Sequence, residues 1–241
     1  MITQSIVKEY KLKIHNVQLE GNKMNYEQMN NNKVYVYGEI VSEAVFSHEV
    51  YGEGFYDMFL KVERLSSQCD ILPITISERI LKEENIKCGD SIALKGQFRS
   101  YNKQIDGKSK LSLTIFVREI IPKVENAPTN IIELSGFVCK EPIYRTTPFN
   151  REISDVLLAV NRAYNKSDYI PCIAWGRNAR FVKSIEIGEK VILQGRIQSR
   201  EYQKKLDDDT IENKVAYEIS ISKIALSPSE EETTESKVFV S

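Results

Sequence analysis

Aromatic and arginine side chains alternate along two strand-like runs in the second half of the sequence. Because side chains on a strand point alternately to its two faces, Tyr169 and Trp175 share one side of the run DYIPCIAW. Arg196, Arg200 and Tyr202 share the outer side of the run VILQGRIQSREY. Exposed bases stack on aromatic rings, and guanidinium groups bind phosphates. This combination predicts contact with a single nucleic-acid strand; the simpler alternative is that the rings cover a hydrophobic patch or an oligomer interface.

The elements that must position these side chains are short strands with one helix among them. In the first half of the chain a helix is expected within 77–90, and strand-like runs cover 33–41, 57–65, 70–76, 91–101 and 110–120. Three strands, a helix and two more strands is the order of the OB-fold, a five-stranded Greek-key barrel that binds oligonucleotides. The same order returns after residue 130. The sequence therefore predicts an all-β chain of two tandem OB-fold barrels, each with a short helix between its third and fourth strands.

A nearly constant offset relates the two halves and indicates a tandem duplication. The offset is 98 residues for four matched pairs, Asp57 with Asp155, Arg64 with Arg162, Asp70 with Asp168, and Pro73 with Pro171. It becomes 99 residues for Gly96 and Gly195, so one residue was gained near the helix.

Domain boundaries follow from composition. The stretch 124–130 contains Pro128 and has no periodicity, which is typical of a linker. We expect a flexible N-terminal extension at 1–32, a first barrel at 33–123, this linker, a second barrel at 131–226 and a short acidic tail at 227–241.

Composition excludes several classes of protein. The net charge of −1 argues against a strongly basic chain, and no apolar run approaches the roughly 20 residues of a membrane span. The N-terminus has no continuous apolar segment of the secretory kind, so a cytoplasmic protein is expected. No P-loop, nucleophile–base pair or metal-ligand spacing is apparent, and neither His15 nor His48 has a catalytic context. We therefore expect no enzyme, no cofactor and no metal.

Four motifs carry a family resemblance over roughly residues 130–225: SGFVCKEPIYRTTP, LLAVNRAY, DYIPCIAWGR and VILQGRIQSREY. This half resembles the bacterial single-stranded-DNA-binding proteins and their relative, the primosomal replication protein. The whole layout, including SHEVYGEGFYDMFLKVERLS in the first half, is similar to the double-OB type of clostridia-like bacteria. The resemblance implies binding of single-stranded DNA with little sequence preference in replication, recombination or repair. It also implies stacking of bases on Tyr164, Tyr169, Trp175 and Tyr202.

Further contacts to DNA are expected from basic side chains and one loop ring. Residues 143–152, between the first two strands of the second barrel, are expected to form a loop that closes over a bound strand or is a solvated hairpin. The expected set is Arg145, Phe149, Arg162, Arg177, Arg196, Arg200 and Lys204.

The first barrel departs from the family pattern. The positions of Tyr164, Tyr169 and Trp175 hold Ser66, Ile71 and Ser77 there. Its fourth strand keeps a partial set, Arg99, Tyr101 and Lys103, which predicts auxiliary DNA contact or a role in oligomerisation. The tail also departs from the family: it is acidic at 230–232 but ends KVFVS, whereas the family's tail closes on Pro-Phe and recruits replication and repair proteins.

The family commonly assembles four OB-folds, so the resemblance implies a homodimer associated with the nucleoid. Two other functions stay open from the residues alone. One is an adaptor of the primosome type, in which the barrel surface binds a protein. The other is an RNA-binding OB protein, because no feature here recognises a 2′-hydroxyl.

Overall fold

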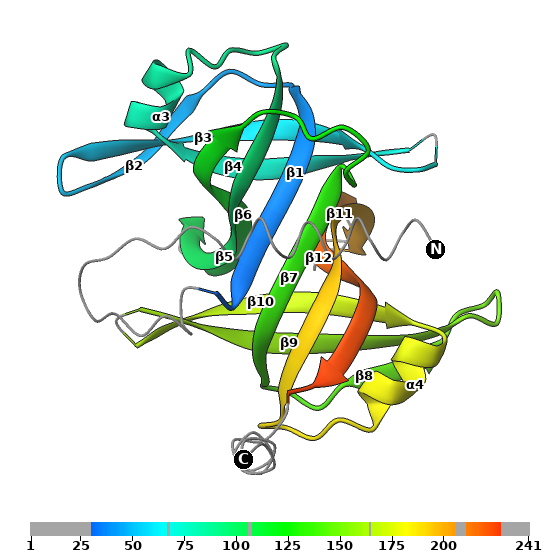
Figure 1. Cartoon of the computed structure of the whole chain (residues 1–241). Helices are drawn as coiled ribbons and strands as arrows, with labels where there is room; N and C mark the ends of the chain where they lie inside the picture. The colour runs from blue at the N-terminus through cyan, green and yellow to red at the C-terminus, as the bar shows by residue number, and fades with distance from the viewer. Residues whose placement is uncertain (1–29, 67, 106–107, 164, 206–210, 228–241) are drawn as a thin grey trace, which may run out of the picture.

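A computed structural model of the chain describes residues 30–66, 68–105, 108–163, 165–205 and 211–227 (Figure 1). Within these ranges the side chains of 103–105, 108–110 and 204–205 are not described. Most of the expected N-terminal extension, most of the acidic tail and Tyr164 lie outside the described residues.

The N-terminal half forms a closed five-stranded barrel. Its strands are β1 (Asn32–Ile40), β3 (Glu53–Glu63), β4 (Cys69–Ser77), β5 (Ser91–Ile105) and β6 (Lys108–Ile121). Antiparallel pairings join β1 to β3, β3 to β4, β6 to β5 and β5 to β1, and a parallel pairing of β4 with β6 closes the ring. Helix α3 (Glu78–Glu83) follows β4, and the Ser77 hydroxyl caps it by accepting the Ile80 N–H at 3.3 Å.

The C-terminal half repeats this topology. Its strands are β7 (Asn130–Val138), β9 (Glu152–Arg162), β10 (Lys166–Trp175), β11 (Lys190–Lys205) and β12 (Ile211–Leu226), with α4 (Arg177–Lys183) after β10. Strand β10 pairs in parallel with β12, and β7 pairs with both β9 and β11. The prediction of an all-β chain with two OB-type barrels is confirmed.

Local structure adds two short strands to the expected elements and makes one helix shorter. Residues 143–152 form a hairpin, the second of the two forms expected, in which β8 (Ile143–Thr146) pairs with the start of β9. Its counterpart β2 (Val45–Val50) pairs with β3 in the other barrel. Helix α3 has six residues and occupies only part of 77–90. Neither short strand has a buried face, because most of their residues are exposed. The sequence therefore has no alternation of apolar and polar residues that would reveal these strands.

Apolar residues that alternate along the strands fill each barrel, among them Leu60, Leu72 and Leu94 in the first and Leu134, Leu158 and Ile170 in the second. One glycine in each long hairpin allows its strand to bend around the barrel. Gly96 and Gly195 lie at register shifts, where a Cβ would come within 2.4 Å of the carbonyl oxygens of Phe116 and Ser220. This close approach explains why glycine recurs at the two positions.

The two barrels are joined edge to edge into one 12-stranded sheet by antiparallel pairing of β1 with β7 (Figure 1). This pairing is symmetric: Asn32 pairs with Leu134, and Val36 pairs with Asn130. The 98-residue offset makes Asn130 the equivalent of Asn32 and Leu134 the equivalent of Val36, so exchanging the halves leaves the pairing unchanged. Helices α3 and α4 lie at opposite ends of the molecule (Figure 1). The duplication thus places the halves around an approximate two-fold axis. Neither helix in the described ranges is long and apolar enough to cross a membrane.

Candidate nucleic-acid interface

Strand β10 presents two of the predicted rings on one outer face of the C-terminal barrel. The side chains of Tyr169 and Trp175 are 46% and 40% exposed, which is large for aromatic residues within a strand. They are six residues apart, about 20 Å along an extended strand. Ile170, Cys172 and Ala174 alternate with them and are buried in the barrel. The strand can therefore offer two stacking platforms to one extended chain.

A groove between the barrels brings together residues predicted separately in each half. It has a volume of about 440 Å³ and is lined by Tyr202 and Val215 from the C-terminal barrel and by Tyr101, Leu111 and Phe59 from the N-terminal barrel. Tyr202 and Tyr101 are 37% and 39% exposed. Burial, followed by the negative charge of Asp57, raises the pKa of Tyr101, so its hydroxyl stays protonated at neutral pH. The groove is mainly apolar and aromatic, which suits the faces of bases.

Several groove residues were not identified from the sequence. Phe59, Leu111, Val215 and Tyr217 line it together with Tyr202. Alternation along VAYEISISKI places Val215 and Tyr217 on one side of β12, so that run held a usable signal. No sequence pattern shows that strands of the two barrels converge there.

Most of the predicted arginines already have carboxylate partners. Arg145 pairs with Asp155 at 2.8 Å, Arg162 with Asp168 at 3.4 Å and Arg200 with Glu218 at 3.5 Å. The Arg145–Asp155 pair is exposed, and such pairs contribute only about 0–1 kcal/mol, so a phosphate can compete for that guanidinium. Arg177 is exposed at the start of α4 and has no ion-pair partner among the described residues. Arg145 and Arg177 are thus the more available cations.

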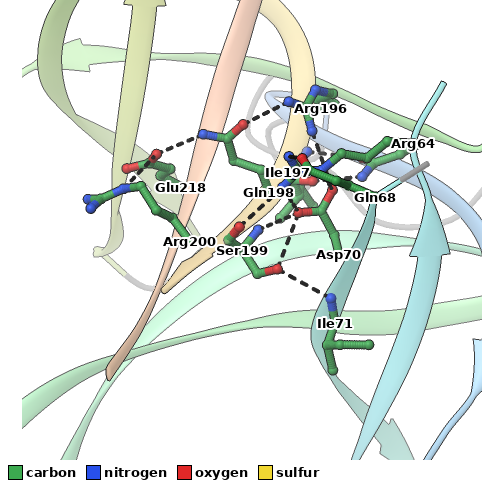
Figure 2. Close-up of polar contacts among 11 residues, drawn as sticks. Arg64, Gln68, Asp70, Ile71, Arg196, Ile197, Gln198, Ser199, Arg200 and Glu218 are labelled. Carbon is green, nitrogen blue, oxygen red and sulfur yellow. Dashed lines mark hydrogen bonds and ion pairs between the residues drawn. The ribbon is translucent and has the colours of Figure 1, made fainter. Parts of the chain in front are cut away.

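Arg196 belongs to a network that fastens the barrels together (Figure 2). Its centre is Asp70 of β4, whose side chain is fully buried. Arg64 donates to both Asp70 oxygens, at 2.8 Å from Nε and 2.6 Å from Nη2. From the other barrel, Arg196 Nη1 lies 3.3 Å from Asp70 Oδ2, and the Ser199 N–H donates to Oδ1 at 2.7 Å. This carboxylate therefore accepts hydrogen bonds from two guanidinium groups and one backbone amide.

The equivalent carboxylate in the other half, Asp168, is less well satisfied. Its Oδ1 accepts the Ser100 N–H at 2.7 Å, and the Tyr169 N–H donates to the Ser100 hydroxyl at 2.7 Å. Asp168 Oδ2 and Arg162 Nε are 3.4 Å apart, a charge contact without hydrogen-bond geometry. Burial raises the pKa of Asp168, and the Ser100 amide and the nearby arginines oppose that shift. Arg162 is consequently directed toward the junction of the barrels.

Alternation alone misjudged part of the outer face. Alternation puts Ile173 and Gln198 on the outer sides of β10 and β11, yet these residues are only 5% and 8% exposed. The Gln198 amide donates to Glu218 at 2.7 Å and its oxygen accepts from Arg196 at 2.9 Å. Side-chain direction along a strand fixes the face, but it does not show which neighbours cover that face.

The remaining predicted residues are only partly described. Phe149 is 87% exposed in the turn between β8 and β9. Lys204 and Lys103 lie on β11 and β5, but their side chains are outside the described set, as is the whole of Tyr164. In the described ranges no group of three or more His, Cys, Asp or Glu residues is placed to hold a metal ion.

Comparison with known proteins identifies a matching family and several relatives. Residues 129–227 match the model of the single-strand binding protein family. Single-stranded DNA-binding protein 1 of Staphylococcus aureus (strain COL) is 34% identical over 83 residues, which are 32% of this chain and 50% of that protein. The single-stranded DNA-binding protein of Clostridium tetani (strain Massachusetts / E88) is 31% identical over 83 residues, 32% of this chain and 57% of that protein. The chain thus spans about half the length of the curated relatives it matches.

Solved structures match across both barrels. The wild-type single-stranded DNA binding protein from Thermus aquaticus aligns with a TM-score of 0.63 at 15% sequence identity. The alignment covers 82% of this chain and 93% of that chain. At this identity the likeness establishes a shared fold.

Proposed function

We propose that this protein, whose residues 129–227 match the model of the single-strand binding protein family, binds single-stranded DNA without catalysing a reaction on it. The exposure of Tyr169 and Trp175 on one face of β10, inside the matched region, carries the proposal. Stacking on these rings and on Tyr202 tolerates any sequence, because every base has a π-face. Arg145, Arg177 and the terminal nitrogens of Arg200, whose Nε faces Glu218, neutralise phosphates beside the rings. The protein acts in the bacterial cytoplasm, where replication, recombination and repair expose single strands.

Competition with unlabelled nucleic acids tests this function. A fluorescein-labelled oligothymidylate bound to the protein should be displaced by unlabelled oligothymidylate, and far less by duplex DNA of the same length, because paired bases cannot stack on the rings. The logarithm of the binding constant should fall linearly with the logarithm of salt concentration, with a slope of about −0.7 for each phosphate neutralised. Equal displacement by duplex DNA would contradict stacking, and preferential displacement by oligouridylate would redirect the proposal to RNA.

Two chains assemble into a homodimer with four OB-type barrels. Support comes from the internal joining of two barrels through β1 and β7, which leaves two barrels in each chain. Mass photometry at nanomolar concentration should give twice the 27.7 kDa of one chain. A single species at the monomer mass would contradict this assembly.

A further inference from the structure

We infer that the N-terminal barrel holds a second nucleotide-binding site, in which Arg99 and Arg118 bind a phosphate of single-stranded DNA beside the rings of Phe116, Phe55 and His48. These five residues are called the Phe116 cluster. The inference rests on the proposed function for the class of ligand. It adds a site at positions unrelated to those of Tyr169 and Trp175, where this barrel carries Ile71 and Ser77.

The rings of the cluster form a continuous series across the outer face. His48 and Phe55 are stacked, with centroids 5.0 Å apart and an angle of 12° between their planes. Phe55 and Phe116 have centroids 5.5 Å apart. They come from β3 and β6, and β4 between them carries Ser77 opposite Phe55 and Thr75 opposite Phe116. Small side chains on the middle strand let the two rings meet.

Two guanidinium groups lie over the last ring of this series. Arg99 Cζ is 4.1 Å from the centroid of Phe116, and Arg118 Cζ is 5.0 Å from it. Both donate to one neutral acceptor, Gln97 Oε1, at 2.7 and 3.2 Å. Planar guanidinium groups held on a ring offer flat faces to a base and N–H donors to a phosphate.

The cluster has more positive charge than its surroundings neutralise. Within the described ranges, neither Arg99 nor Arg118 makes an ion pair, and Arg99 Nε is buried without a hydrogen-bond partner. Burial, together with repulsion from Arg118 and Arg162, lowers the pKa of Arg99 to about 10, and Asp168 acts in the opposite direction. Burial also lowers the pKa of Arg118. A bound phosphate would relieve this repulsion and supply the missing acceptors.

The equivalent surface of the C-terminal barrel carries a carboxylate and lacks both arginines of the cluster. The parallel pairings match Thr75 and Phe116 with Ile173 and Ser220, so Thr114 corresponds to Glu218. Glu218 pairs with Arg200 and accepts from Gln198. The N-terminal barrel carries Thr114 there, and it has Arg99 and Arg118 where the other barrel has Gln198 and Ser222. Its two arginines therefore lack that carboxylate and stay available for an external anion.

The cluster also lies beside the first proposed site. Ser100, the residue after Arg99, accepts the Tyr169 N–H at 2.7 Å across the junction of the barrels. Strands β5 and β10 are therefore neighbours, and a DNA strand that stacks on Tyr169 can reach Arg99 along the surface. Long strands would contact both sites, whereas a short one is held by the C-terminal barrel alone.

Oligothymidylates of two lengths separate the sites in the full chain. One has about 8 nucleotides, within the roughly 4–16 that one OB-fold covers, and the other about 35. Fluorescence of Trp175 reports binding of the short oligomer to the C-terminal barrel, and anisotropy of an end-labelled long oligomer reports total affinity. The variants are Arg118→Gln, Arg118→Lys and Phe116→Leu, with Arg79→Gln as control. Arg79 lies on α3 of the same barrel, is exposed, and pairs with Glu83 at 2.8 Å.

Arg118→Gln should weaken binding of the long oligomer about tenfold, the loss expected for one charged hydrogen bond, and reduce the size of the salt slope by about 0.7. Arg118→Lys should keep the wild-type salt slope. Phe116→Leu should lower the affinity for the long oligomer and leave the salt slope unchanged. Binding of the short oligomer, and all binding by Arg79→Gln, should match wild type, and circular dichroism should show every variant folded. Wild-type affinity and slope in Arg118→Gln, with Trp175 still quenched, would overturn this inference alone. Absence of any binding by wild-type protein would overturn the proposed function as well.

Discussion

Replacement of Trp175 by alanine should weaken binding of single-stranded DNA by about 5- to 150-fold, because each base stacked on a ring contributes about 1–3 kcal/mol. Trp175 ends β10 and is 40% exposed, so its indole has surface free for a base. Tyr169→Ala should have an effect of the same kind. Fluorescence anisotropy with an end-labelled oligothymidylate measures both changes.

Tyr51→Asn is the matched control for loss of an exposed ring. Tyr51 is fully exposed at the tip of the β2–β3 hairpin with φ of 51°, a conformation that asparagine accepts readily. This variant should bind like wild type. Equal affinity of Trp175→Ala and wild type would show that the ring on β10 does not stack on DNA.

Asp70→Asn should lower the free energy of unfolding by about 3–5 kcal/mol, the usual cost of removing one partner from a buried ion pair. The substitution keeps the shape of the side chain but removes the charge that Arg64 and Arg196 share. Both guanidinium groups then remain in the junction without a counter-charge, and the tie between β4 and β11 weakens. Urea unfolding followed by circular dichroism measures the change.

Asp155→Asn is the corresponding control. Asp155 belongs to an exposed pair with Arg145, and loss of such a pair costs about 1 kcal/mol or less. The urea midpoint should therefore fall much further for Asp70→Asn than for Asp155→Asn. Equal midpoints would mean that the Asp70 network does not hold the barrels together.

The sequence predicted those features that a repeat along the chain or an alternation within one strand reveals. The offset that matches Asp70 with Asp168 predicted two copies of one barrel, and the fold class is confirmed. Alternation in DYIPCIAW placed Tyr169 and Trp175 outside the barrel, and both are exposed. Both features are regularities along the chain, the first a repeat between its halves and the second an alternation within one strand, and a single sequence records them directly.

Features that depend on contact between distant strands were not predictable. Arg196 looked like a free outward cation, but it reaches Asp70 in the other barrel, 126 positions away in the chain. Of the Phe116 cluster the sequence predicted Arg99 alone, because its rings do not lie at the positions equivalent to Tyr169 and Trp175. Its rings come instead from β3 and β6, which meet only across β4.

Intrinsic fluorescence gives the most direct test of the central claim, because Trp175 is the one tryptophan in the chain. Its emission is to be followed while oligothymidylate is added to wild-type protein at low salt, and again with duplex DNA of equal length. We expect strong, saturable quenching by the single strand, reversed by added salt, and little change with the duplex. Emission that stays constant at oligothymidylate concentrations that saturate binding would contradict stacking on Trp175 and the interface built around it.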